Sequence, residues 1–180
     1  MNNILSDTIG IDSVIQMIQL NLYNKLPNYW AGSIDGYGRV YKNIDHNNDN
    51  SIPQWFDSSK LEYVDVRYND NVNCTFCFID SDNHDSEDGE VFTSNVKCVF
   101  MVNLNKILPS YEERADAKAQ MTVLNILQDL SSNGYTITKV EKGISNVFSG
   151  FDTKKILNSD IQPKHCFSVN IKLSYHLECS

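Results

Sequence analysis

Acidic side chains are concentrated in one stretch of the chain. Between Asp80 and Glu90 the sequence reads DSDNHDSEDGE, which holds six carboxylates in eleven residues. The Asp-x-Asp start matches the first ligands of an EF-hand calcium loop. The pattern then departs from that loop, because Asp85 stands where the sharp-turn glycine belongs and Val91 where the bidentate glutamate belongs.

We therefore predict a solvated hairpin tip that binds no metal. A charged loop that docks on a partner or faces a lumen is one alternative, and a metal site is the other. Six carboxylates repel one another unless a cation lies among them, so they should stay in water. The acids expected to face solvent, a neighbouring ring or a DNA channel are Asp80, Asp82, Asp85 and Asp88.

Histidine and cysteine are the other residue types that could hold a metal. The four histidines have no H-x-x-x-H or H-E-x-x-H spacing, so a catalytic zinc site is not expected. Cys74 and Cys77 match the C-x-x-C spacing, but the run Val72–Ile79 alternates like a strand and places the two sulfurs on opposite faces. We expect reduced thiols that act as small buried residues.

Motifs of the common enzymes are missing from the sequence. There is no Gly-x-Ser-x-Gly, no phosphate-binding P-loop and no Gly-x-Gly-x-x-Gly, and Gly36-Tyr37-Gly38 lacks the strand-then-helix context of a nucleotide site. A Ser/His/Asp site would have to be assembled in space. We therefore predict a non-enzymatic protein without a cofactor.

Composition places the chain among folded proteins. Its 180 residues are 41% hydrophobic and 11% aromatic, which is enough for one domain spanning residues 1–180. No apolar run reaches the length of a membrane span, and the N-terminus does not match a signal peptide. The net charge of −8 argues against wrapping nucleic acid. We expect a protein that stays in the cytoplasm where it is made, or leaves it within a particle.

The longest regular pattern runs from Phe167 to Cys179, where every second residue is apolar. This alternation predicts one extended strand of roughly 44 Å with one buried and one wet face. A strand of this length must bend across a core or pair with something beyond its own domain, which favours an assembly protein.

The remaining elements follow from periodicity and turn residues. A helix is expected over Asp12–Leu26, capped by Asp12 or Ser13 and ended by Pro27. Residues 28–60 are expected to be irregular, and their aromatic residues either hold the loop against the core or contact a partner. The strands expected next are Leu61–Tyr68, Val72–Asp80 and Val91–Leu104, the first two joined by a turn at residues 69–71.

The second half of the chain adds another strong helix. A capping box at Ser110–Glu113 predicts its start, and an apolar stripe runs from Ala115 to Leu130. A strand over Tyr135–Glu141 and a short helix over Asp152–Asn158 are expected before the closing strand. This order predicts an α+β fold, an antiparallel sheet with long strands and with helices packed on one face, plus an elaborated loop region at about 28–60.

The loop Gly143–Gly150 carries apolar side chains in a segment too short to form its own core. We therefore expect these side chains at a subunit or partner interface. The residues concerned are Ile144, Val147 and Phe148, with Phe151 beside them.

In its order of parts, the region from Val91 to Cys179 resembles tail terminator or tail-completion proteins at the head–tail junction of tailed phages. The parts are a long strand, a helix over Glu112–Leu130, a strand, a short helix and a closing strand that ends in Tyr175-His-Leu-Glu-Cys179. The resemblance covers about half of the chain. The Asn-rich composition suits a phage of low-GC gut bacteria, including the crAss-like group.

The resemblance implies a homo-oligomeric ring, six- or twelve-fold, between portal and tail. Its partners would be portal, adaptor or tail proteins, DNA would pass through the lumen as cargo, and no membrane would be involved. The expected location is the virion, after synthesis in the host bacterial cytoplasm. The alternatives are a cytoplasmic binding or adaptor domain and a small hydrolase-type enzyme.

Overall fold

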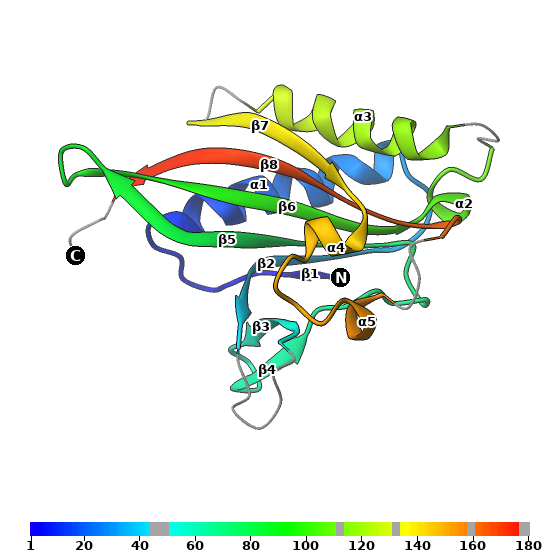
Figure 1. Ribbon diagram of the computed structural model, residues 1–180, viewed down its shortest axis with the longest axis horizontal. Helices are drawn as coiled ribbons and strands as arrows, with labels where there is room; N and C mark the ends of the chain where they lie inside the picture. Colours follow the sequence, from blue (N-terminus) through cyan, green and yellow to red (C-terminus); the bar gives the residue numbers. More distant parts are fainter. Residues whose placement is uncertain (44–50, 111–113, 131–133, 158–160, 177–180) are drawn as a thin grey trace.

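The protein has a mixed α/β fold built on one open sheet of eight strands, most of which pair antiparallel (Figure 1). The computed structural model describes residues 1–43, 51–110, 114–130, 134–157 and 161–176. Its strands follow the order β4-β3-β2-β5-β6-β8-β7, and β1 pairs with β2 outside this path. The strands are β1 (Asn2–Asn3), β2 (Ile34–Lys42), β3 (Pro53–Asp57), β4 (Glu62–Asp65), β5 (Cys74–Ser86), β6 (Val91–Asn103), β7 (Tyr135–Lys142) and β8 (Lys164–His176).

Two helices of about four turns each and several short helical segments complete the fold. The longer ones are α1 (Ile11–Lys25) and α3 (Ala115–Gln128). The short ones are α2 (Leu104–Ile107), α4 (Ile144–Val147), α5 (Thr153–Ile156) and the 3₁₀ turn η1 (Leu26–Asn28).

The larger core lies between one face of the sheet and the helices α1 and α3. Its centre is a row of rings on adjacent strands, in which Phe100 stacks on Phe76 at 5.7 Å and on Phe167 at 5.0 Å between centroids. Trp30 meets Phe100 edge-on at 6.1 Å. The predicted stripe of α3 is confirmed, because Ala119, Val123 and the other apolar members are buried against this face.

A smaller core covers part of the opposite face, because alternate strand residues point there. Cys77, Val99 and Met101 pack there against α4 and α5. The helices contribute Val147 and Ile156, and Phe148, the residue after α4, joins them. Figure 1 shows α4 in front of the sheet and α1 behind it. The prediction that the helices pack on one face therefore does not hold for α4 and α5.

The sequence suggested that region 28–60 is irregular. This is wrong for much of it, because the region contains strands β2 and β3. Gly36 allows close packing in β2, because a Cβ there would lie 2.6 Å from the ring of Phe76, which is fully buried. Trp30 and Trp55 are pinned in the core, whereas Tyr29 and Tyr41 are exposed. Most of the polar tract 43–51 lies outside the described residues.

Strand pairing corrects a further expectation. Residues 61–68 and 72–80 were expected as strands joined by a turn, but β4 pairs with β3, and β5 lies between β2 and β6. β2 and β5 run parallel, and the chain between them forms the β3–β4 hairpin. Figure 1 shows this hairpin standing away from the main sheet; we call β3, β4 and the end of β2 from Tyr41 the arm.

Helix starts were predicted less well than helix bodies. α1 is capped by Gly10, at φ 56°, without a side-chain hydrogen bond, so the expected cap at Asp12 or Ser13 is wrong. α3 begins after Arg114, and the backbone of Arg114 takes a left-handed conformation. Most of the expected capping box lies outside the described residues.

The closing strand β8 follows its predicted alternation as far as His176, the last described residue. Phe167, Val169, Ile171, Leu173 and Tyr175 face the larger core. The opposite face is exposed to solvent only towards the end of the strand. Nearer its start, Ser168 on that face is buried.

Candidate functional site

The parallel strands β2 and β5 separate at their carboxyl ends, which is where ligands bind in many open sheets. Their register ends at Val40 opposite Ile79, after which β2 turns to pair with β3 and β5 continues beside β6. A pocket of about 340 Å³ lies at this fork. Its polar lining includes Arg39, Lys42, Asp80 and Asp82, and Tyr41 and Phe151 supply rings.

A bulge in β5 shapes one side of the fork. Asp80 pairs with Val96 and His84 pairs with Ser94, so that Ser81, Asp82 and Asn83 face only Asn95. Asp82 takes a left-handed conformation at φ 58°. In a regular strand, residues four apart are separated by about 13 Å, so the bulge is what brings the side chains of Asp80 and His84 together.

The side chains around the bulge form a connected hydrogen-bond network. The imidazole Nε2 of His84 lies 2.9 Å from Asp80 Oδ2, and its Nδ1 contacts the hydroxyl of Tyr175. Ser94 Oγ donates to Asp80 Oδ1 at 2.5 Å. Because a carboxylate only accepts, a neutral His84 satisfies both contacts when Nε2 carries the hydrogen and the Tyr175 hydroxyl donates to Nδ1.

Arg39 joins this network to helix α1. Its guanidinium donates through Nε and Nη2 to the two oxygens of Asp12, each at 2.8 Å, and its Nη1 lies 3.5 Å from Asp80 Oδ2. The Asp80 side chain is 2% exposed, so its charge is held by fixed partners rather than by water. Burial lowers the pKa of Arg39, but the hydrogen bond and charge of Asp12, together with Tyr41 and Asp80, outweigh it, so that the pKa is raised.

Tyr175, His84 and Asp80 contact one another in the same order as the members of a Ser-His-Asp catalytic triad, with a phenol in the place of the serine hydroxyl. Burial, and secondly the charge of Asp80, raise the pKa of Tyr175, while Arg39 opposes them. Tyr175 is also only 7% exposed and stacks on Phe92. A neutral, enclosed phenol is a poor nucleophile. The contacts of the network join β5 to β6, to β8 and, through Arg39, to β2.

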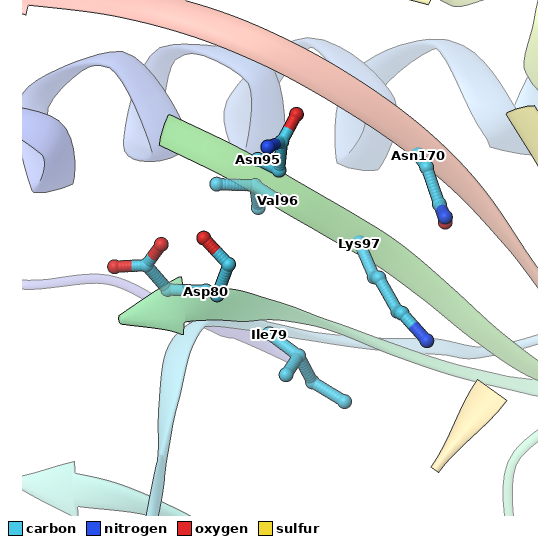
Figure 2. A pocket seen from close by; sticks show the side chains of 7 residues that line it. Ile79, Asp80, Asn95, Val96, Lys97 and Asn170 are labelled. Atoms are coloured by element: carbon cyan, nitrogen blue, oxygen red, sulfur yellow. The ribbon is translucent and has the colours of Figure 1, made fainter. Parts of the chain in front are cut away.

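A smaller hollow of about 110 Å³ lies beside the bulge, between β5 and β6 (Figure 2). Figure 2 shows Asp80 and Lys97 pointing away from each other. Lys97 Nζ instead lies 3.0 Å from Glu141 Oε2, which also accepts from Asn170 at 3.0 Å. Lys139 donates to the other oxygen of Glu141 at 2.8 Å.

The Glu141 network predicts a pH-dependent stability. The hydrogen bond from Lys139, together with those from Asn170 and Lys97, lowers the pKa of Glu141 to about 2. A lowered pKa stabilises the fold above the ordinary glutamate pKa, and this contribution is lost as the pH falls through about 2. We expect Glu141→Gln to destabilise the protein at pH 7 and much less near pH 2.5, as measured by urea unfolding. An equal loss at both pH values would contradict this assignment.

The acidic residues singled out from the sequence divide into two groups. Asp82, Asp85 and Asp88 are exposed, as expected, and none of them has an ion pair within the described ranges. Asp80 was expected in solvent and is instead buried. Its carboxylate has Arg39, His84 and Ser94 as polar partners in place of water. In the part of the chain that the structure describes, no group of acids, histidines and cysteines is placed to hold a metal ion.

The apolar loop was expected to expose its side chains, and this is wrong for two of them. Val147 is 1% exposed and Phe148 is fully buried, because α4 packs both into the smaller core. Ile144 and Phe151 are partly buried at the edge of the same core. In this conformation Val147 and Phe148 are covered by their own chain.

The cysteine prediction is confirmed for the residues that the structure describes. Cys74 faces the larger core and Cys77 the smaller one, so the two sulfurs lie on opposite faces of β5. Cys74, Cys77, Cys98 and Cys166 are free and buried. Burial raises the pKa of Cys77 to about 12, which leaves the thiol unreactive at neutral pH.

Sequence reasoning missed Arg39, Ser94 and Tyr175 as members of one network. They come from three different strands, and no local spacing joins them.

Comparison with known proteins found no matching family model, no similar curated protein and no similar solved structure. Among the described residues, no helix is both long enough and apolar enough to span a membrane.

Proposed function

We propose that this protein is a non-enzymatic structural subunit of a phage neck or tail ring, which joins portal or adaptor to tail around the DNA channel. It would act as a homo-oligomer and reside in the virion after synthesis in the host cytoplasm. The order of strands and helices in its second half supports the proposal. So do the 13-residue strands β5, β6 and β8, which would give each subunit the long sheet of an assembly protein.

The observation that carries the proposal is the aromatic face of the arm. Tyr63 packs on Phe56 at 5.2 Å and on Tyr41 at 5.9 Å between centroids. Tyr41 is 41% exposed and Tyr63 is 50% exposed, whereas the other side of the arm places Trp55 in the smaller core. Clustered tyrosines that project from a domain are typical of contact surfaces between proteins.

Pairing of free strand edges is a less favourable route to assembly. β7 lies at one end of the sheet and has a bulge between Ile137 and Lys139. It also carries Lys139, Glu141 and Lys142, and charges and bulges of this kind discourage edge-to-edge pairing. The opposite edge, β4, is only four residues long. The arm's side chains are therefore the better candidates for the subunit contact.

The proposal predicts that the double variant Tyr41→Ser/Tyr63→Ser assembles at least about tenfold more weakly than the wild type, because hot-spot aromatic residues carry much of an interface's energy. Light scattering after size-exclusion chromatography measures the oligomer. Tyr29→Ser is the matched control, since Tyr29 is 58% exposed and lies outside the arm. If the double variant and the control assemble alike, the arm is not the contact.

A second candidate function rests on the network at the fork. The observation behind it is the contact of His84 with Asp80, because Asp80 also lines the pocket of about 340 Å³ and a small hydrolase-type enzyme needs such a pair beside a pocket. In that case, His84→Gln would abolish turnover of an ester or phosphoester substrate without changing assembly. The ring proposal expects no turnover in either protein.

A further inference from the structure

A second polar pocket, of about 320 Å³, lies on the face of the sheet that carries the smaller core. It opens between the start of the parallel pair β2 and β5 and the segment that begins with Asp65. Thr75 on β5 and Asp35 on β2 are register neighbours in its wall, and Tyr37 lies beside them. We call it the Thr75 pocket.

The hydroxyl of Thr75 points to a missing ligand. The residue is 2% exposed, and its Oγ1 has no hydrogen-bond partner among the described residues. Buried hydroxyl groups are normally hydrogen-bonded, because an unmade bond costs the full desolvation of the group. Valine would fill the same space in a strand without this cost. A hydroxyl kept here is therefore best explained by a hydrogen-bonding occupant of the pocket.

The charges of the pocket indicate what kind of occupant fits. Three carboxylates, Asp35, Asp65 and Asp70, line it together with one guanidinium, that of exposed Arg67. Asp35 Oδ1 lies 2.7 Å from the amino group of Met1, and Asp70 Oδ1 lies 3.5 Å from Lys164 Nζ.

Asp65 differs from the other two acids. It accepts a hydrogen bond from the amide of Gln54 at 2.8 Å, and it has no ion pair within the described part of the chain. The structure also places no three ligating side chains around a metal position in that part of the chain. The occupant should therefore be an organic cation rather than a metal ion.

We propose that the Thr75 pocket binds a small organic cation with several N–H donors, of the guanidinium or alkylammonium class. Thr75 Oγ1 accepts one N–H, and the Asp65 carboxylate supplies the opposite charge. This site lies apart from the fork. Asp65, the last residue of β4, belongs to the arm and lies two residues from Tyr63, but the inference does not depend on the ring assembly.

Calorimetric titration of the full-length protein with agmatine, which carries both cation types, tests the proposal. Wild-type protein should bind agmatine, and Thr75→Val and Asp65→Asn should each weaken binding at least about tenfold. Thr75→Ser keeps the hydroxyl and should retain binding. Thr122→Val is the matched control, because the Thr122 hydroxyl bonds within α3, to Lys118 O, and lies outside the pocket.

Neutral butylurea and N-acetyl-arginine amide complete the test. Butylurea keeps N–H donors without the charge and should bind at least about tenfold more weakly than agmatine. Binding of N-acetyl-arginine amide equal to that of agmatine would support the proposal and show that a peptide side chain can supply the cation as well as a free small molecule. The proposal is overturned if agmatine does not bind, or if it binds Thr75→Val and Asp65→Asn as tightly as the wild type. Asp65→Asn keeps the test decisive if Thr75→Val does not fold.

Discussion

Asp80→Ala is expected to lower the free energy of unfolding by about 3 kcal/mol, because it breaks a buried charge network at several points. The substitution leaves Ser94 Oγ without its acceptor and removes the partner of His84 Nε2. It also takes one of two carboxylates from Arg39. Urea unfolding at pH 7 measures the loss.

Asp85→Ala provides the matched control for this prediction. Asp85 lies on the same strand, but its side chain is exposed and has no ion pair in the described ranges. A surface change of this kind should stay within about 0.5 kcal/mol of the wild type. If Asp80→Ala and Asp85→Ala unfold at the same urea concentration, Asp80 belongs to a solvated tip, as the sequence suggested.

Phe148→Ala should lower the free energy of unfolding by about 3–5 kcal/mol, the usual cost of emptying the space of a buried phenylalanine. Phe148 is fully buried and meets Phe151 edge-on at 6.0 Å between ring centroids. The cavity would open in the smaller core, beside Val147 and Ile156. Denaturant unfolding of the variant, under conditions that keep it monomeric, gives the value.

The control for this change is Ile161→Ala, because Ile161 is a large apolar residue that is 73% exposed. It should shift the stability by no more than about 0.5 kcal/mol. A Phe148→Ala protein that keeps wild-type stability and loses only assembly would show that the loop projects outward. That outcome would restore the interface role expected from the sequence.

Elements with an uninterrupted period could be predicted from the sequence. The alternation of β6 and β8 reflects the face that packs in the larger core, and the helical stripes of α1 and α3 reflect burial against the same core. Each element lies within about four residues of its expected bounds. β2 was missed because Gly36 and Gly38 are typical of loops. In this fold Gly36 allows close approach to the ring of Phe76, and Gly38 lies against Gln19.

The site was less predictable than the fold, because it depends on a local irregularity. The Asp80–His84 contact exists only where three residues of β5 face a single residue of β6, and no sequence signal marks this bulge. The burial of Phe148 was missed for a related reason. A short loop with scattered apolar residues looks exposed until a sheet face with Cys77, Val99 and Met101 is placed under it.

Native mass spectrometry of the full-length wild-type protein, over a range of concentrations, tests the proposed function most directly. The ring proposal predicts a closed assembly of six or twelve chains that persists on dilution. A protein that remains monomeric at every concentration would contradict it.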